Sequence, residues 1–179
     1  MTDLSRRELM KILSAAALAP VTGAELHLPA IDVAGPGFRI RTITAGMNLR
    51  GAADVQGLEP TLRFLKQAKR MATDAGYEVQ TIRVATQPFL EEAGPRARAD
   101  ALSGLQALDR AVVDEGALLS IGPVLAPDGD DPAFGTWAAE LARTTRNISF
   151  SVRVASPDHS ASPRGVTAAG EAMAAIARS

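Results

Sequence analysis

Segments with strand-like and helix-like patterns alternate along this chain from residue 38 onward, and this alternation constrains the fold more than any other feature. The first unit lies between Phe38 and Phe89: an extended stretch at 38–44, a helical pattern at about 58–75 and a second extended stretch at 77–85. In the helical stretch, leucine and alanine recur three or four residues apart. Gly76 follows at the position where a helix commonly ends in glycine. We interpret this unit as strand, helix, strand.

The same alternation continues to the end of the chain. Asp131 and Pro132 are typical of a helix start, with Asp as the N-cap and Pro at the first helical position. The further elements that we expect are helices at about 96–114, 131–142 and 165–178 and strands at 117–121 and 148–154. The order β-α-β-α-β-α-β-α predicts a parallel sheet with right-handed crossovers. The predicted fold class is therefore α/β, with about four βα units in an open sheet or in part of a barrel.

Residues 1–24 resemble a twin-arginine export signal, with paired arginines, a short apolar run at 12–19 and small residues at plausible cleavage sites. The motif residues are Ser5, Arg6, Arg7 and Lys11. The apolar run is too short for a permanent transmembrane helix. We therefore expect a signal peptide at 1–24, a linker at 25–37 and an α/β domain at 38–179, with the twin-arginine machinery as a partner and a periplasmic or secreted location. The alternative is an amphipathic first helix on a cytosolic protein.

Composition excludes several functional classes. The net charge of −1 counts against nucleic acid as the main partner, because nucleic-acid binding requires a basic surface. The chain has no cysteine, which excludes disulfides, thiolate metal sites and cysteine nucleophiles. No phosphate-binding loop, dinucleotide fingerprint or zinc-protease motif is present, and the aspartates at 128–131 lack the spacing of a calcium loop. We predict no metal site and leave the cofactor unknown.

Three predicted strands repeat a short pattern, a β-branched residue followed by arginine. The arginines are Arg41, Arg83 and Arg153, and each is followed three residues later by a hydroxyl residue: Thr44, Thr86 and Ser156. Because side chains alternate between the faces of a strand, we expect the arginines to share one face and the hydroxyls the other. Three guanidinium groups on one face would suit a carboxylate or a phosphate. The alternative is that the arginines pair with acidic residues or point into solvent.

Ligands of parallel α/β proteins bind beyond the carboxyl ends of the strands. The residues that we expect to bind a small anionic ligand there are Arg41, Arg83, Arg153, Thr44, Asn48, Thr86, Gln87, Ser156 and His159. No catalytic residue follows from the pattern, and whether the protein is an enzyme stays open. The alternative functions are a non-enzymatic assembly or binding module and a truncated, inactive fragment of a larger protein.

Residues 38–46, 76–89 and 151–156 resemble a bacterial family of uncharacterised proteins known as domain of unknown function 711. The block Gly-Tyr-Glu-Val-Gln-Thr-Ile-Arg at 76–83 is its most specific part. The resemblance implies an α/β barrel similar to that of pyruvate formate-lyase and no established activity. It also implies that the chain corresponds to the N-terminal part of such a barrel, because family members are usually more than twice as long. A partial barrel leaves sheet edges exposed, so we expect a homodimer, another partner or closure as a small open sheet.

Overall fold

The computed structural model describes residues 38–126, 129, 131–155 and 160–179, which belong to one compact unit. It contains a four-stranded parallel sheet in the order β1-β2-β3-β4. The strands are β1 (Ile40–Met47), β2 (Val79–Thr86), β3 (Ala117–Pro123) and β4 (Ile148–Ser151). The predicted α/β class with four βα units is confirmed. The predicted signal peptide (1–24) and linker (25–37) lie outside the described residues.

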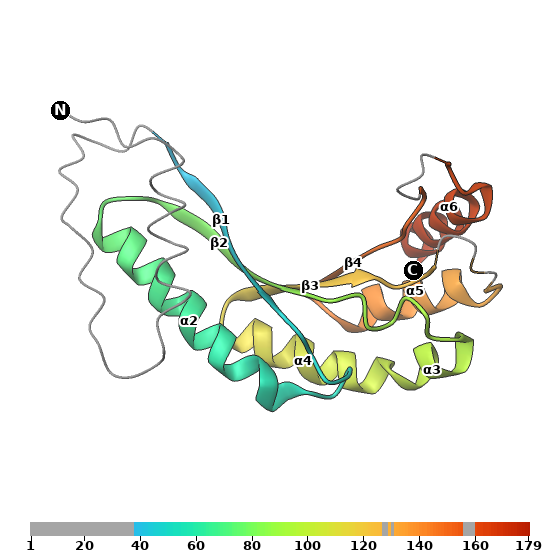
Figure 1. The fold of residues 1–179 in the computed structure, drawn as a ribbon, viewed down its shortest axis with the longest axis horizontal. Helices are drawn as coiled ribbons and strands as arrows, with labels where there is room; N and C mark the ends of the chain where they lie inside the picture. The colour runs from blue at the N-terminus through green and yellow to red at the C-terminus, as the bar shows by residue number, and fades with distance from the viewer. Residues whose placement is uncertain (1–37, 127–128, 130, 156–159) are drawn as a thin grey trace. The chain divides into compact units, whose positions relative to one another are not determined.

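The described helices are α2 (Val55–Asp74), α3 (Pro95–Asp100), α4 (Leu102–Asp114), α5 (Phe134–Thr144) and α6 (Pro163–Arg178). Neighbouring strands in the sheet are also consecutive in the chain, so crossovers of one hand place their helices on one face. Figure 1 shows α2, α4 and α5 on the same side of the sheet. The structure therefore has two layers, one of strands and one of helices.

The core lies between these two layers. On the helix side of the sheet, Ile82, Val84 and Leu119 are almost completely buried. The helices contribute leucine, valine and aromatic side chains at helical spacing, namely Leu58, Leu62 and Leu65 from α2, Leu105, Leu108 and Val112 from α4, and Phe134, Trp137 and Leu141 from α5. Burying each large apolar side chain contributes about 1.5–3 kcal/mol, so this layer is the main source of stability.

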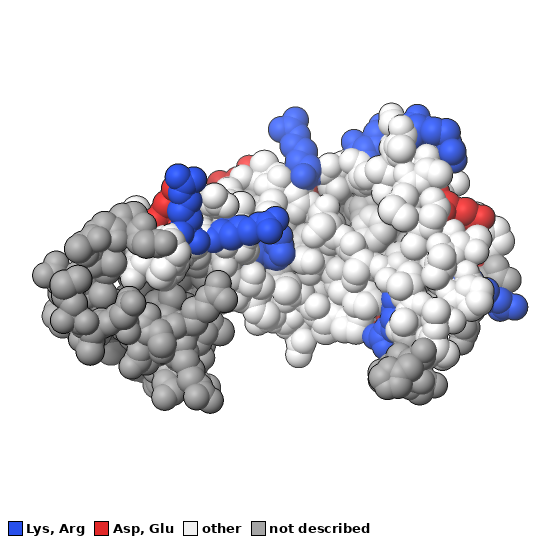
Figure 2. Space-filling view, turned by 90° about the horizontal axis from the view of Figure 1, so that it is seen from above, with Lys and Arg blue, Asp and Glu red and all other residues white. Residues whose placement is uncertain are grey.

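The other side of the sheet, which we call the open face, is covered by no described helix. Its residues, taken from the strand register, are Ile40, Thr42, Thr44, Gly46, Val79, Thr81, Arg83, Ala85, Leu118, Ser120 and Ser149. Most of them are small or carry a hydroxyl group, and Arg83 is the charged residue in this set. Figure 2 looks down on the molecule from this side and shows a surface that is mostly free of charged side chains. The open face is therefore polar but almost uncharged.

Several element boundaries differ from the predictions. The stretch 96–114 forms two helices that meet at Ala101, rather than one. The helix expected at Asp131 begins at Phe134, although the Asp131 carboxylate accepts a hydrogen bond from the backbone N–H of Ala133, as an N-cap would. The last strand ends at Ser151, three residues earlier than expected. Gly76 does follow a helix in a left-handed conformation, with a φ of 87°, as predicted.

Candidate functional site

The strand register separates two of the three arginines that were expected to share a face. Ile40 pairs with Val79 and Thr44 pairs with Arg83, so Arg41 lies beside Gln80 rather than beside Arg83. Arg83 is therefore level with Thr44, three positions after Arg41. Because side chains alternate between the two faces, this odd offset puts the side chains of Arg41 and Arg83 on opposite faces. Arg41 is on the side of Ile43, and Arg83 is on the open face. The prediction of a shared arginine face is therefore wrong for this pair.

Thr44 also lies elsewhere than predicted. It was expected at the carboxyl end of its strand and on the face opposite to the arginines, but β1 extends to Met47 and Thr44 lies mid-strand. In the ladder it is the direct neighbour of Arg83, and Leu118 of β3 flanks Arg83 on the other side. The open face therefore places a hydroxyl group and an apolar side chain on either side of one guanidinium group.

The guanidinium group of Arg83 is incompletely paired. Its Nε atom is shielded from solvent and has no hydrogen-bond partner among the described residues. No acidic side chain of the described residues forms an ion pair with it. A shielded donor without an acceptor costs about 1–3 kcal/mol. The open face therefore holds one cationic donor that a ligand acceptor could satisfy.

Arg153, by contrast, is already paired. It follows β4, and its Nε lies 2.8 Å from Glu91 Oε1, in the segment after β2. Its Nη2 donates to Glu91 Oε2 at 3.1 Å. The alternative in which an arginine of the repeated pattern pairs with an acidic residue is therefore confirmed for Arg153. The pair joins the segments that follow two strands at the carboxyl edge of the sheet.

The remaining predicted site residues have mixed roles. The Gln87 amide binds the backbone of Leu49: Oε1 accepts from the Leu49 N–H at 2.9 Å, and Nε2 donates to the Leu49 carbonyl. Thr86 Oγ1 donates to the Gln87 carbonyl at 3.0 Å. Asn48 is exposed at the end of β1. Gln87 and Thr86 therefore make hydrogen bonds within the chain just after the strands. Ser156 and His159 lie outside the described residues.

A buried arginine that was not predicted holds together the loops at the carboxyl edge. Arg98 is 2% exposed, and its Nε and Nη2 donate to the carbonyls of Val124 and Ala93 at 3.0 and 2.6 Å. Its third partner is the carboxylate of Asp131. Burial lowers the pKa of Arg98, and the charge of Asp131 opposes that shift. The chain between 96 and 114 had a helical pattern, and nothing in it pointed to a partner 33 residues away.

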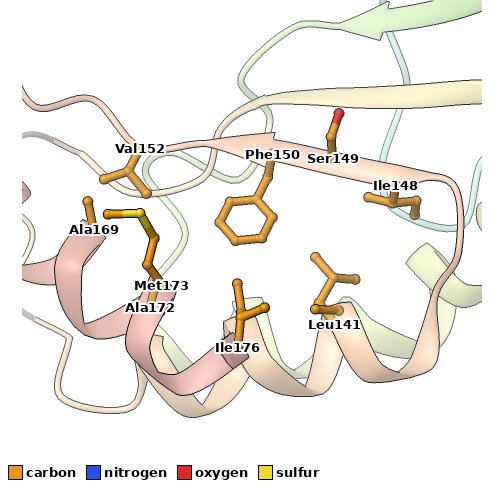
Figure 3. A pocket seen from close by; sticks show the side chains of 10 residues that line it. Leu141, Ile148, Ser149, Phe150, Val152, Ala169, Ala172, Met173 and Ile176 are labelled. Atoms are coloured by element: carbon orange, nitrogen blue, oxygen red, sulfur yellow. The ribbon is translucent and has the colours of Figure 1, made fainter. Parts of the chain in front are cut away.

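An apolar cleft between β4, α5 and α6 was also not predicted. It has a volume of about 440 Å³ and is lined by Leu141, Ala142, Ile148, Ser149, Phe150, Val152, Ala169, Ala172, Met173 and Ile176. Figure 3 shows Ile148 and Phe150 of β4, and Val152 just after it, pointing toward the side chains of the two helices, while Ser149 points away. In the described part of the chain, no three His, Asp or Glu side chains are grouped to hold a metal ion. None of the described helices is long and apolar enough to cross a membrane.

These features define an α/β protein of four parallel βα units with one face of the sheet uncovered among the described elements. The chain belongs to the family described as "Uncharacterised ACR (DUF711)", whose family model matches residues 33–179. No curated protein matches the chain. No solved structure matches it either. The resemblance inferred from residues 38–46, 76–89 and 151–156 is therefore confirmed.

Proposed function

We propose that the protein binds a small anionic ligand on the open face of the sheet, with Arg83 as its main cationic contact. The observation that carries this proposal is the shielded Nε of Arg83, which has no acceptor among the described residues. A carboxylate or phosphate oxygen is the acceptor that a guanidinium group binds best, because two N–H groups can donate to it in parallel.

The surroundings of Arg83 support an anion more than a neutral ligand. Thr44 lies directly beside it and can donate a hydroxyl hydrogen to a second ligand oxygen. The next row along the open face consists of Gly46, Ala85, Ser120 and Ser149, whose small side chains leave room above the sheet. Arg41 and the paired Arg153 are not part of this site, so it is smaller than the nine-residue set expected from the sequence.

A thermal-shift screen of the full chain against small carboxylates and inorganic phosphate tests the proposal. A ligand at a hundred times its Kd stabilises the folded state by about 2.7 kcal/mol and raises the melting temperature. Arg83→Met should abolish that increase, whereas Arg41→Met is the matched control because its side chain is on the opposite face. If no anion raises the melting temperature, or if both variants respond as the wild type does, the proposal is wrong.

We also propose that residues 1–24 direct export by the twin-arginine route, which would place the protein in the periplasm or outside the cell. The support is the sequence motif itself, the paired Arg6 and Arg7 ahead of an apolar run. A reporter that is active only after export, fused behind residues 1–24, tests this. Replacing both arginines with lysine keeps the charge and should abolish export by this route. An unchanged reporter signal would contradict the proposal.

A further inference from the structure

The apolar cleft lies beside a strand edge that no described strand covers. β4 is at the end of the strand order, so the backbone groups on its outer side have no ladder partner among the described residues. α6 packs against α5 and turns the side chains of Ala169, Ala172 and Ile176 into the cleft. In an α/β sheet, such a helix normally covers the next strand. The cleft is therefore the place where the helix-facing side chains of a fifth strand would pack, next to those of β4.

β4 has only four residues and its pairing with β3 shifts register after Ser120, but its edge carries no charged side chain that would keep another strand from pairing. Its sequence, Ile-Ser-Phe-Ser, contains no charge and no proline. Apolar side chains next to it are exposed to solvent: Met173, which lines the cleft, is 66% exposed, and Val154 is 40% exposed. An uncharged edge beside an exposed apolar surface is typical of a site that pairs with another strand.

The same chain contains a strand that fits this place. β1 lies at the opposite end of the strand order, and no described strand pairs with its outer edge. On the helix side of the sheet it presents Ile43, Ala45 and Met47, which are only partly buried and for which α2 is the covering helix. Among the described residues, β1 thus has no helix on its outer side and α6 has no strand beyond β4 to cover. β1 of one copy could therefore occupy the strand position next to α6 of another copy.

We propose that β1 of a second copy of this chain pairs with β4 and rests on α6, and that the reverse contact forms at the other edge. A two-fold axis relates the copies, so two four-stranded sheets close into a ring of eight parallel strands. Closure leaves no free edge, and the helices of both copies remain outside. This inference stands on the edges and the cleft and does not depend on anion binding at Arg83.

The open face fits the interior of such a ring. Along the strands, the row Thr44, Arg83 and Leu118 alternates with the smaller row Gly46, Ala85, Ser120 and Ser149. The interior of an eight-stranded barrel is just wide enough for side chains to fill it, commonly with larger and smaller residues in alternating layers, or for it to hold one small ligand. Pairing β4 with β4 of the second copy is less suitable, because two α6 helices would then meet at one strand pair and both β1 edges would stay free.

Light scattering coupled to size exclusion on the full chain tests the proposal. The expected result is a mass of twice 18.7 kDa at micromolar concentration. Met173→Lys places a charge in the cleft and should leave only the single-chain mass. Val166→Lys is the matched control, because Val166 is on the same helix and 52% exposed but does not line the cleft. A single-chain mass for the wild type, or equal masses for both variants, would overturn the proposal.

Cross-linking identifies the strand that occupies the cleft. The natural chain has no cysteine, so any thiol cross-link comes from the introduced residues. A variant with both Ala45→Cys and Met173→Cys should form a covalent dimer with a short thiol-reactive cross-linker, and each single variant should not. If Met173→Cys alone forms the covalent dimer, β4 pairs with itself and the proposed arrangement is wrong. Equal circular dichroism spectra and melting temperatures would exclude misfolding of the variants.

Discussion

Thr44 and Arg83 lie directly opposite each other in the parallel ladder between β1 and β2, on the face of the sheet that no described helix covers. This pairing puts one cationic group in the middle of a surface formed mainly by hydroxyl, glycine and alanine residues. The Nε of Arg83 is shielded but has no acceptor among the described residues. The proposed anion binding therefore requires the guanidinium group of Arg83, whereas the ligand-free fold would be more stable without it.

Arg83→Met is expected to raise the free energy of unfolding by about 1 kcal/mol in the absence of ligand. Methionine keeps the apolar part of the side chain and removes a shielded donor whose missing hydrogen bond costs about 1–3 kcal/mol. Urea unfolding of the ligand-free protein measures the change. Arg41→Met, at an exposed position, should change stability by less than about 0.5 kcal/mol. A clear loss of stability in Arg83→Met would show that the guanidinium group has a partner inside the fold.

The order and type of the elements could be predicted from the sequence because they depend on local patterns. The register could not, because it depends on how two strands pack against the same helix. Arg41 and Arg83 occupy equivalent places in a repeated motif, yet the ladder sets Arg83 beside Thr44. An odd offset of three residues is enough to move a side chain to the other face. Sequence similarity between strands therefore predicts a shared face only when the register is known.

The loops at the carboxyl edge illustrate a second limit. Asp131 was expected to be the N-cap of a helix, and its Oδ1 does accept a hydrogen bond from the N–H of Ala133 at 2.9 Å. Its other oxygen binds Arg98, which lies 33 residues earlier in the chain and is buried. A partner at that distance is fixed by tertiary packing and leaves no trace in local patterns. The helix begins at Phe134 instead of at Pro132.

Arg98→Ala should lower the free energy of unfolding by about 3–5 kcal/mol. The substitution leaves the carboxylate of Asp131 without its buried counter-charge and removes the donors to the carbonyls of Val124 and Ala93. Urea unfolding compares it with Arg143→Ala, which breaks the exposed pair with Glu140 and should cost at most about 1 kcal/mol. Similar losses in the two variants would mean that the buried pair does not hold the loops together.

Asp109→Ala should destabilise the protein by about 2–3 kcal/mol, because two backbone donors would lose their acceptor. The carboxylate of Asp109, on α4, accepts from the N–H groups of Arg146 and Asn147 at 2.8–3.1 Å, just before β4 begins. Asp109→Asn keeps one acceptor oxygen and should lose less. Hydrogen exchange at residues 146 and 147 measures the effect directly. Unchanged exchange in Asp109→Ala would mean that these donors have another acceptor.

Replacing Asp54 should change how stability depends on pH at the acidic end. Hydrogen bonds from the Arg50 side chain and backbone, together with that from the Gly57 N–H, lower the pKa of Asp54 to about 2. Because the ionised carboxylate is the form that caps α2, its contribution is fully present above the unfolded pKa of about 3.9. It is lost as the pH falls through about 2.

The stability difference between wild type and Asp54→Asn should therefore be constant above about pH 5 and should shrink as the pH falls toward about 2. Asparagine can still accept the capping hydrogen bond, so the variant isolates the charge. Urea midpoints measured across this range for both proteins give the difference. Arg50→Gln removes the group that contributes most to the lowered pKa of Asp54, so in this background the decline should be smaller and should end at a higher pH. A difference that does not vary with pH would show that Asp54 acts through its shape alone.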